Sequence, residues 1–198
     1  MDDRKKVASP YTEIRVLVTG VTGLLGVALQ RPASLNISGF APCTAGRTLS
    51  PSMLFKTLPV ELTDPSGIQD VFKYVKPDLV IHTMAIESVD FAETNREVAY
   101  AVNVKGTQLV ADLCCEFNSR IIYISSNAIF DGRTLLYLET SMVNPINHYG
   151  ELKIKADQII QESALNWAIV RSIMMCGWSY PGQGIHHSIP KKLRPSLG

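Results

Sequence analysis

The stretch Ile14–Gly26, IRVLVTGVTGLLG, decides the fold. Its first half, Ile14–Thr19, is a continuous apolar run rich in β-branched residues, which is typical of a strand buried on both faces of a parallel sheet. Gly20, Gly23 and Gly26 follow at spacings of three, where this strand would turn into a helix. Glycines at such a turn let the backbone approach a pyrophosphate, to which the helix N-terminus offers free N–H groups. The alternative is a tight turn that binds nothing, and the strand-to-helix context favours dinucleotide binding.

The rest of the chain alternates strand-length apolar runs with helix-like segments. The runs stand at Gly39–Thr44, Thr57–Val60, Leu79–His82, Ile121–Ser125 and Trp167–Val170. The helix-like segments extend from Asp64-Pro65 to Lys76-Pro77, over Glu97–Phe117 and over about Tyr149–Leu165. An N-cap followed by proline marks the start of the first of them. This βαβ rhythm predicts an α/β fold with a doubly wound, mostly parallel, Rossmann-like sheet.

Composition indicates one globular domain and a small-molecule partner. The 198 residues are 46% hydrophobic and carry 19 basic and 18 acidic side chains, which argues against a nucleic-acid or membrane-surface partner. We see no secretory signal and no membrane-spanning run, so the cytoplasm is the expected location. The four cysteines lack CxxC spacing, and we expect neither a disulfide nor a metal site. The expected organisation is a flexible segment at 1–13, a nucleotide-binding domain at 14–177 and an irregular tail at 178–198.

The choice of cofactor depends on the end of the second strand. An acidic residue about twenty positions after the glycines would hold the 2′-hydroxyl of NAD. The sequence has no Asp or Glu between Glu13 and Glu61, whereas Arg47 lies just beyond the second strand. An arginine there could bind a 2′-phosphate bidentately, although a single arginine can also be an ordinary solvated cation. We therefore favour NADP, with NAD as the alternative.

Three polar side chains are expected to converge at the carboxyl edge of the sheet. Tyr149 and Lys153 stand at i and i+4, so a helix would present both on one face. The pair follows the fifth strand, whose end carries Ser125-Ser126. A phenol near an ammonium can exchange a proton with a carbonyl oxygen at neutral pH, because the ammonium lowers the pKa of the phenol. The trio suits hydride transfer to or from a carbonyl.

These motifs occur in the order found in a known family. The TGxxGxxG run, the stretch Asn103-Val104-Lys105-Gly106-Thr107, the serine strand Tyr123–Ser126 and the YxxxK pair resemble the extended short-chain dehydrogenases/reductases. Within that family, Ser125–Gly132 and Pro145–Lys153 look like the corresponding segments of dTDP-4-dehydrorhamnose reductases. They also resemble the regulatory β subunit of methionine adenosyltransferase, which shares the fold. The resemblance covers residues 14–177.

The resemblance implies a role for each motif residue. The pyrophosphate would lie against Gly20, Gly23 and Gly26, and Thr22, Leu24 and Leu25 of the same turn would also belong to the cofactor site. Glu61 and Leu62 would lie beside the adenine, and Ala85 and Asn103 would belong to the cofactor-side framework. Ser126, Tyr149 and Lys153 would form the catalytic trio, with the last two also contacting the cofactor. His82-Thr83-Met84-Ala85 is bulkier than the small-residue run usual in the family.

The function implied is NADP-dependent reduction of a keto group on a nucleotide sugar. Asn127-Ala128 stand where sugar-nucleotide dehydratases carry Asp-Glu, which disfavours elimination. The alternative is a non-catalytic, NADP-binding regulatory subunit that docks onto a partner enzyme, and the resemblance also allows a homo-oligomer. Extended members continue past the sixth strand into a substrate-binding part, which is largely missing here. We therefore expect this short form to be impaired as an enzyme.

Overall fold

A computed structural model describes residues 14–21, 23–29, 38–43, 56–163, 166–173 and 175. Within them, six strands form one sheet in the order β3-β2-β1-β4-β5-β6, and every neighbouring pair is parallel. The strands are β1 (Arg15–Thr19), β2 (Ser38–Cys43), β3 (Lys56–Pro59), β4 (Leu79–His82), β5 (Arg120–Ser126) and β6 (Trp167–Ser172). This order is that of a doubly wound dinucleotide-binding sheet. The predicted fold class is confirmed.

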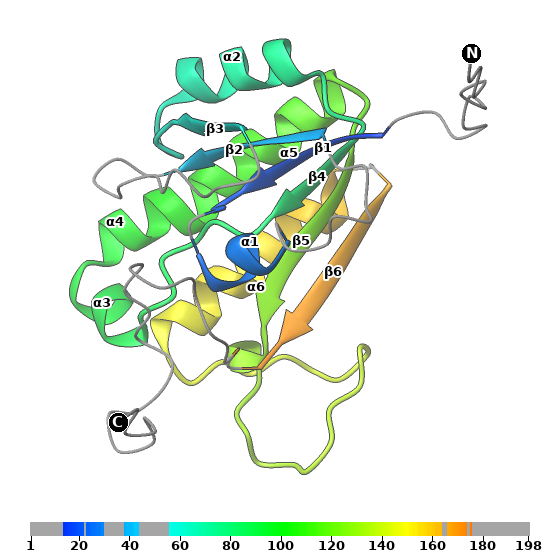
Figure 1. Ribbon diagram of the computed structural model, residues 1–198. Helices are drawn as coiled ribbons and strands as arrows, with labels where there is room; N and C mark the ends of the chain where they lie inside the picture. The colour runs from blue at the N-terminus through cyan, green and yellow to red at the C-terminus, as the bar shows by residue number, and fades with distance from the viewer. Residues whose placement is uncertain are drawn as a thin grey trace, which may run out of the picture.

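Helices cover both faces of the sheet. They are α1 (Leu24–Leu29), α2 (Pro65–Val75), α3 (Val89–Thr94), α4 (Arg96–Tyr100), α5 (Gly106–Glu116) and α6 (His148–Glu162), with a π-helical turn at Ala101–Lys105 and a 3-10 turn at Asn127–Ile129. In Figure 1, α1 lies in front of the sheet, and α5 and α6 lie behind it. The loop between β5 and α6 projects beyond the carboxyl ends of β5 and β6.

Helix α2 begins and ends where its sequence predicts. The side chain of Asp64 accepts a hydrogen bond from the Gly67 N–H, and Pro65 takes the first helical position. Lys76 adopts a left-handed conformation with φ 49° and ends the helix, since its N–H bonds back to the Phe72 carbonyl. The face toward the sheet is apolar and buried, and consists of Ile68, Val71, Phe72 and Val75.

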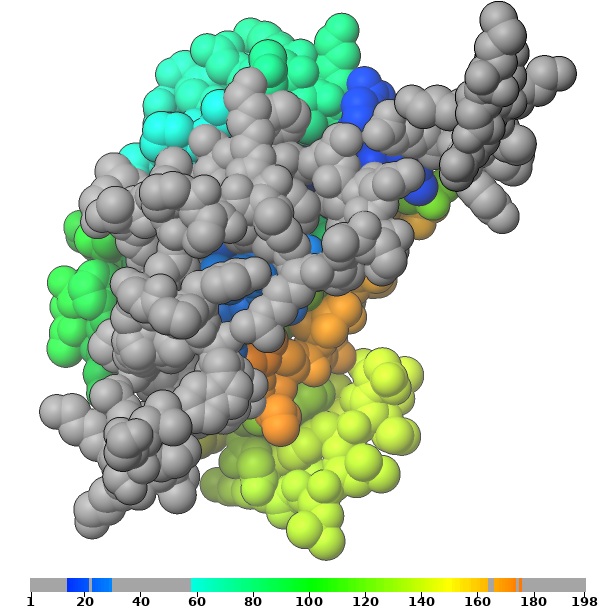
Figure 2. Space-filling view, in the orientation of Figure 1, coloured from blue at the N-terminus to red at the C-terminus, as the bar shows by residue number. Residues whose placement is uncertain are grey.

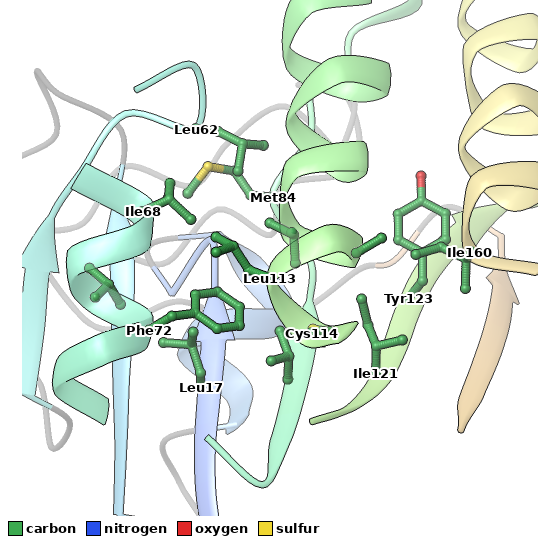
Figure 3. Close-up of a cluster of buried hydrophobic side chains, with 14 of the residues drawn as sticks. Leu17, Leu62, Ile68, Phe72, Met84, Leu113, Cys114, Ile121, Tyr123 and Ile160 are labelled. Carbon is green, nitrogen blue, oxygen red and sulfur yellow. The ribbon is translucent and has the colours of Figure 1, made fainter. Parts of the chain in front are cut away.

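The main core lies between the sheet and the layer formed by α2, α5 and α6 (Figure 3). Leu17 from β1, Phe72 from α2 and Ile121 from β5 are almost fully buried there. Burying one such side chain stabilises the fold by about 1.5–3 kcal/mol. Tyr123 of β5 lies between α5 and α6 in Figure 3, with 1% of its surface exposed. The core therefore fixes the strands and helices whose ends form the site.

The segment expected as one helix over Glu97–Phe117 is built differently. Its start agrees with the prediction, since α4 begins at Arg96, and a separate short helix, α3, precedes it. Residues Ala101–Lys105 then form a π-helical turn before α5. One extra residue per turn frees a backbone carbonyl from the α-helical pattern, and such turns are frequent at functional sites.

The expected ends of the chain, 1–13 and 178–198, lie outside the described residues. So does part of the second expected strand, because β2 is described to Cys43 and the run was expected to reach Thr44. Among the residues that the structure describes, no helix is long and apolar enough to cross a membrane.

Candidate active site

The glycine turn between β1 and α1 is closely packed against its own backbone. Gly20 has φ +75°, and a Cβ there would lie 2.7 Å from the Thr83 hydroxyl oxygen. A Cβ on Gly26 would overlap the backbone of Gly20 and Val21. The Gly23 N–H donates to the Gly20 carbonyl at 2.9 Å and closes the turn. Two of the three glycines are thus required by packing, and the turn brings bare backbone to the carboxyl edge of the sheet.

The turn stands where the strand order reverses. β1 and β4 are neighbours in the centre of the sheet, with Thr19 in register with His82. The Thr19 hydroxyl accepts hydrogen bonds from the N–H groups of Thr83 and Met84, at 3.1 and 3.2 Å. The Thr83 hydroxyl donates in return to the Thr19 carbonyl. These bonds hold the two strand ends together at the point where doubly wound folds bind ligands.

Asn103 supports the segment that follows β4. Its side chain accepts from the Ile86 N–H at 2.7 Å and donates to the Ile86 carbonyl at 3.0 Å. Asn103 is 1% exposed and lies in the π-helical turn. Ala85 is therefore held between Met84, which bonds to Thr19, and Ile86, which bonds to Asn103, at the carboxyl edge of the sheet. The role of both residues on the cofactor side stays a prediction.

Ser126 and Tyr149 meet at the carboxyl end of β5. The Ser126 hydroxyl accepts from the Ala128 N–H at 3.2 Å, and it lies near enough to the Tyr149 hydroxyl to lower the pKa of that group. Asn147 caps α6, since its side chain accepts from the Gly150 N–H at 2.8 Å. A Cβ on Gly150 would overlap the Ala128 carbonyl, so this glycine lets α6 approach the turn after β5. The structure therefore brings together two of the three residues expected to act on a carbonyl.

Lys153 lies one turn further along α6, with 2% of its surface exposed. Its Nζ donates to the Tyr123 hydroxyl and to the Ile124 carbonyl, each at 2.9 Å, and lies 5.9 Å from the centre of the Tyr149 ring. Burial lowers the pKa of the ammonium to about 8, while the nearby Asp157 carboxylate acts to raise it. Asp157 itself pairs with Arg171 of β6 at 3.2 Å.

Tyr149 does not have the lowered pKa that we expected from its ammonium neighbour. Burial raises its pKa, and only the hydrogen bond from Ser126 opposes the rise. Desolvation outweighs the ammonium because the Lys153 Nζ is bound to groups of β5. The Glu87 carboxylate raises the pKa of Tyr149 further. The raised pKa keeps the Tyr149 hydroxyl protonated at neutral pH.

A pocket of about 240 Å³ lies among the residues that follow β5 and those that precede α6. It is lined by Asn127, Ala128, Phe130, Asp131, Gly132, Tyr137, Ile146 and Asn147. Its far wall is the loop after β5, which stands out from the body beside β6 in Figure 2. The Asp131 carboxylate organises this loop by accepting hydrogen bonds from the Tyr137 hydroxyl, the Arg133 N–H and the Asn144 side chain. The pocket is a candidate for the reacting end of a substrate.

The remaining expected residues divide into three groups. Leu24 and Leu25 open α1 and are half-buried. Leu62 is 1% exposed and packs in the core against Gly106, so any contact with an adenine would come from its backbone. Glu61 lies beside it, after β3. Thr22 and Arg47 lie outside the described residues, and the structure leaves the choice between NADP and NAD open.

Sequence reasoning missed two residues of the site. The sequence pattern indicated only that Tyr123 belongs to a strand, yet its hydroxyl accepts a hydrogen bond from the Lys153 ammonium. Gly150 was quoted only as part of the YxxxK segment, although its lack of a Cβ allows α6 to approach β5. Its place beside Tyr149, at the start of a helix that must abut a strand end, is a signal that could have identified it.

Comparisons with known proteins agree with this geometry. A family model described as "RmlD substrate binding domain" matches residues 14–186. Methionine adenosyltransferase 2 subunit beta of Danio rerio is 31% identical over 175 residues, which are 88% of this chain and 51% of that protein. dTDP-4-dehydrorhamnose reductase of Escherichia coli (strain K12) is 27% identical over 172 residues, which are 86% of this chain and 53% of that protein.

Solved structures give the same result. A crystal structure of dTDP-4-dehydrorhamnose reductase from Bacillus anthracis, in complex with NADP, has a TM-score of 0.69 and 29% sequence identity. The match covers 84% of this chain and 55% of that chain. The chain therefore spans about half the length of the relatives that it matches.

Proposed function

The chain belongs to the RmlD substrate-binding domain family, and from that premise we propose that it binds NADP(H) and reduces a keto group on a nucleotide-linked sugar. The observation that carries the proposal is that Ser126 and Tyr149 lie near each other at the carboxyl end of β5, with the Lys153 ammonium 5.9 Å from the centre of the Tyr149 ring. A hydroxyl pair with an adjacent cation suits a carbonyl oxygen that gains a proton.

A nicotinamide dinucleotide would lie at the carboxyl edge of the sheet. Gly20 and Gly26 allow the tight turn between β1 and α1 that would bring backbone N–H groups to its pyrophosphate. The segment at Ala85, held through Asn103, would border the nicotinamide half. A bound NADPH would supply the hydride. We favour NADP over NAD because Arg47 follows the second strand in a stretch without acidic residues, and because the B. anthracis reductase was solved with NADP.

The residues of the chain handle the proton. Ser126 donates a hydrogen bond to the carbonyl oxygen and orients it toward Tyr149. Tyr149 then gives its hydroxyl proton to that oxygen as the carbonyl carbon is reduced, and the alcohol leaves with both hydrogens. The tyrosinate that remains is stabilised by the Lys153 ammonium and takes a proton from water. Because burial keeps Tyr149 protonated, the resting site is prepared for reduction.

The pocket between β5 and α6 gives the proposal a substrate site. About 240 Å³ accommodates part of a sugar, and the lining mixes aromatic and polar side chains from the loop after β5. Asn127 and Ala128, which stand where sugar-nucleotide dehydratases carry Asp-Glu, line this pocket, and this disfavours an elimination.

A second candidate function comes from the other group of relatives. Methionine adenosyltransferase 2 subunit beta matches at 31% identity, and its name describes a subunit of an enzyme. In this alternative the crevice binds the cofactor without turnover, and the protein acts by docking onto a partner enzyme. The motif residues are compatible with both functions.

One comparison distinguishes the two. NADPH oxidation is followed with a panel of nucleotide-linked keto sugars, for the wild-type chain and for Tyr149→Phe, together with a pull-down of partner enzymes. The reductase proposal expects turnover that Tyr149→Phe lowers by about 10²- to 10⁴-fold without loss of NADPH binding. NADPH binding without turnover on any sugar, together with capture of a partner enzyme, would favour the regulatory alternative.

A further inference from the structure

A chain of buried polar side chains runs behind the crevice, from β1 to α6. The His82 ring bonds the Thr19 hydroxyl through Nδ1 at 2.7 Å and the Thr107 hydroxyl through Nε2 at 3.1 Å. Thr107 also lies near Tyr123, whose hydroxyl accepts from the Lys153 Nζ at 2.9 Å. Each of these five residues is at most 2% exposed. Breaking such a chain is costly, because every member would leave a partner unsatisfied away from water.

The protons of this chain can be assigned without ambiguity. The Thr19 oxygen already accepts from two backbone N–H groups, so its own proton goes to His82 Nδ1. Nε2 of the ring therefore carries the hydrogen and donates it to Thr107. The Thr107 hydroxyl donates in turn to the Asn103 carbonyl at 2.8 Å, inside the π-helical turn. Burial, together with the positive charge of Lys153, lowers the pKa of His82 to about 3, which agrees with a neutral ring.

Thr107 joins the His82 ring to the π-helical turn. Its hydroxyl accepts from His82 Nε2 at 3.1 Å and donates to the Asn103 carbonyl at 2.8 Å. Tyr123 lies near this threonine, and its own hydroxyl accepts from Lys153. Figure 3 shows Tyr123 between α5 and α6. The ammonium of α6 is thus held by a residue of β5 that lies beside the His82–Thr107 network.

We propose that Tyr123 is a positioning residue for Lys153, and that Thr107 anchors Tyr123 through the π-helical turn. The hydroxyl of Tyr123 and the carbonyl of Ile124 hold the ammonium at a fixed place beside Tyr149. The functional meaning of this placement rests on the proposed function, in which Lys153 supports the tyrosinate and contacts the cofactor. The placement itself is a property of the chain and can be measured without any ligand.

Removing the Tyr123 hydroxyl leaves a buried ammonium with one fewer acceptor. The charged and titratable groups that face it are Tyr149 and Asp157 on α6, the neutral His82 on β4, and Arg171 on β6 through its pair with Asp157. Of these, only the Asp157 carboxylate favours the charged ammonium, and Arg171 partly neutralises it. The Tyr123→Phe variant should therefore lose the proton of Lys153 at a lower pH than the wild-type chain.

The test is a lysine-specific NMR titration of the full chain, with the Lys153 signal assigned by its absence in Lys153→Met. We expect the Lys153 midpoint to fall by about one pH unit or more in Tyr123→Phe, because losing a hydrogen bond to a charged group shifts its pKa by about that amount. Thr107→Val should shift it in the same direction by less, and Thr107→Ser, which keeps the hydroxyl, should leave it unchanged. Tyr100→Phe removes a tyrosine hydroxyl away from the site and is the matched control.

The outcomes separate this inference from the proposed function. An unchanged Lys153 midpoint in folded Tyr123→Phe, or equal shifts in Thr107→Val and Thr107→Ser, would overturn the positioning role. NADPH affinity is measured on the same samples. At a pH between the Lys153 midpoints of Tyr123→Phe and of the wild type, Lys153 is neutral in the variant and charged in the wild type, so NADPH affinity should be lower for the variant. If the wild-type chain binds no NADPH while the midpoint still moves, the proposed function fails and the positioning role stands.

Discussion

Replacing Gly26 by alanine should damage the fold at the turn that the sequence marks most clearly. An added Cβ would overlap the Gly20 carbonyl and the Val21 backbone, which cannot move without opening the turn. Overpacking of this kind costs about 1–3 kcal/mol, and a clash with backbone falls at the upper end of that range. A Cβ on Gly23 would meet only the Gly20 carbonyl, at 3.2 Å, and should cost less than about 1 kcal/mol.

The difference between the two variants is the measured quantity. About 2 kcal/mol corresponds to roughly 4–8 °C in Tm for a chain of this size. Urea unfolding and a thermal melt of Gly26→Ala, Gly23→Ala and the wild type give the free energies of unfolding. Gly26→Ala should also bind NADPH weakly, because its turn is displaced. Equal stabilities of the two variants would refute the argument that the third glycine is required by backbone packing.

Three further variants test other parts of the structure. Arg47→Ala should weaken NADPH binding by about tenfold and leave NADH binding unchanged in a fluorescence titration. An equal loss of affinity for NADPH and NADH would contradict a contact between Arg47 and the 2′-phosphate. Asp78→Asn should lower the urea midpoint at pH 7 but not near pH 2. Hydrogen bonds from Arg15 lower the pKa of Asp78 from its usual 3.8 to about 2, and the stabilisation that they give is lost as the pH falls through that interval. Asp131→Asn should speed hydrogen exchange in the loop after β5 and leave the core strands protected, since an amide cannot accept all three hydrogen bonds that the carboxylate accepts. Unchanged exchange in the loop would show that the carboxylate does not organise it.

Local patterns predicted those parts of the fold that local chemistry decides. The strand and glycine turn at Ile14–Gly26 are visible because burial on both faces and backbone packing leave a continuous signature. The start and end of α2 are visible because Asp64 caps its first turn and Lys76-Pro77 ends it. Periodicity could not show the π-helical turn in Glu97–Phe117, because a single extra residue shifts the apolar face without removing it.

The electrostatics of the site depended on tertiary contacts. Tyr149 and Lys153 share one helix face, as their spacing predicts, but the pKa of Tyr149 is set by its burial and by Ser126. The bond between Lys153 and Tyr123 joins residues thirty positions apart, and neither the spacing nor the resemblance indicated it. Distances between segments decide which of two opposing effects on a pKa is larger, and the sequence carries no measure of them.

The central claim is that Tyr149 donates a proton in an NADPH-linked reduction at this crevice. The most direct measurement is the rate of NADPH oxidation by the wild-type chain and by Tyr149→Phe, with a dTDP-linked 4-keto sugar and with NADPH binding measured on the same samples. If Tyr149 donates the proton, both proteins bind NADPH, and the variant oxidises it about 10²- to 10⁴-fold more slowly. Oxidation at equal rates by the two proteins, or a wild-type chain that binds no NADPH, would contradict it.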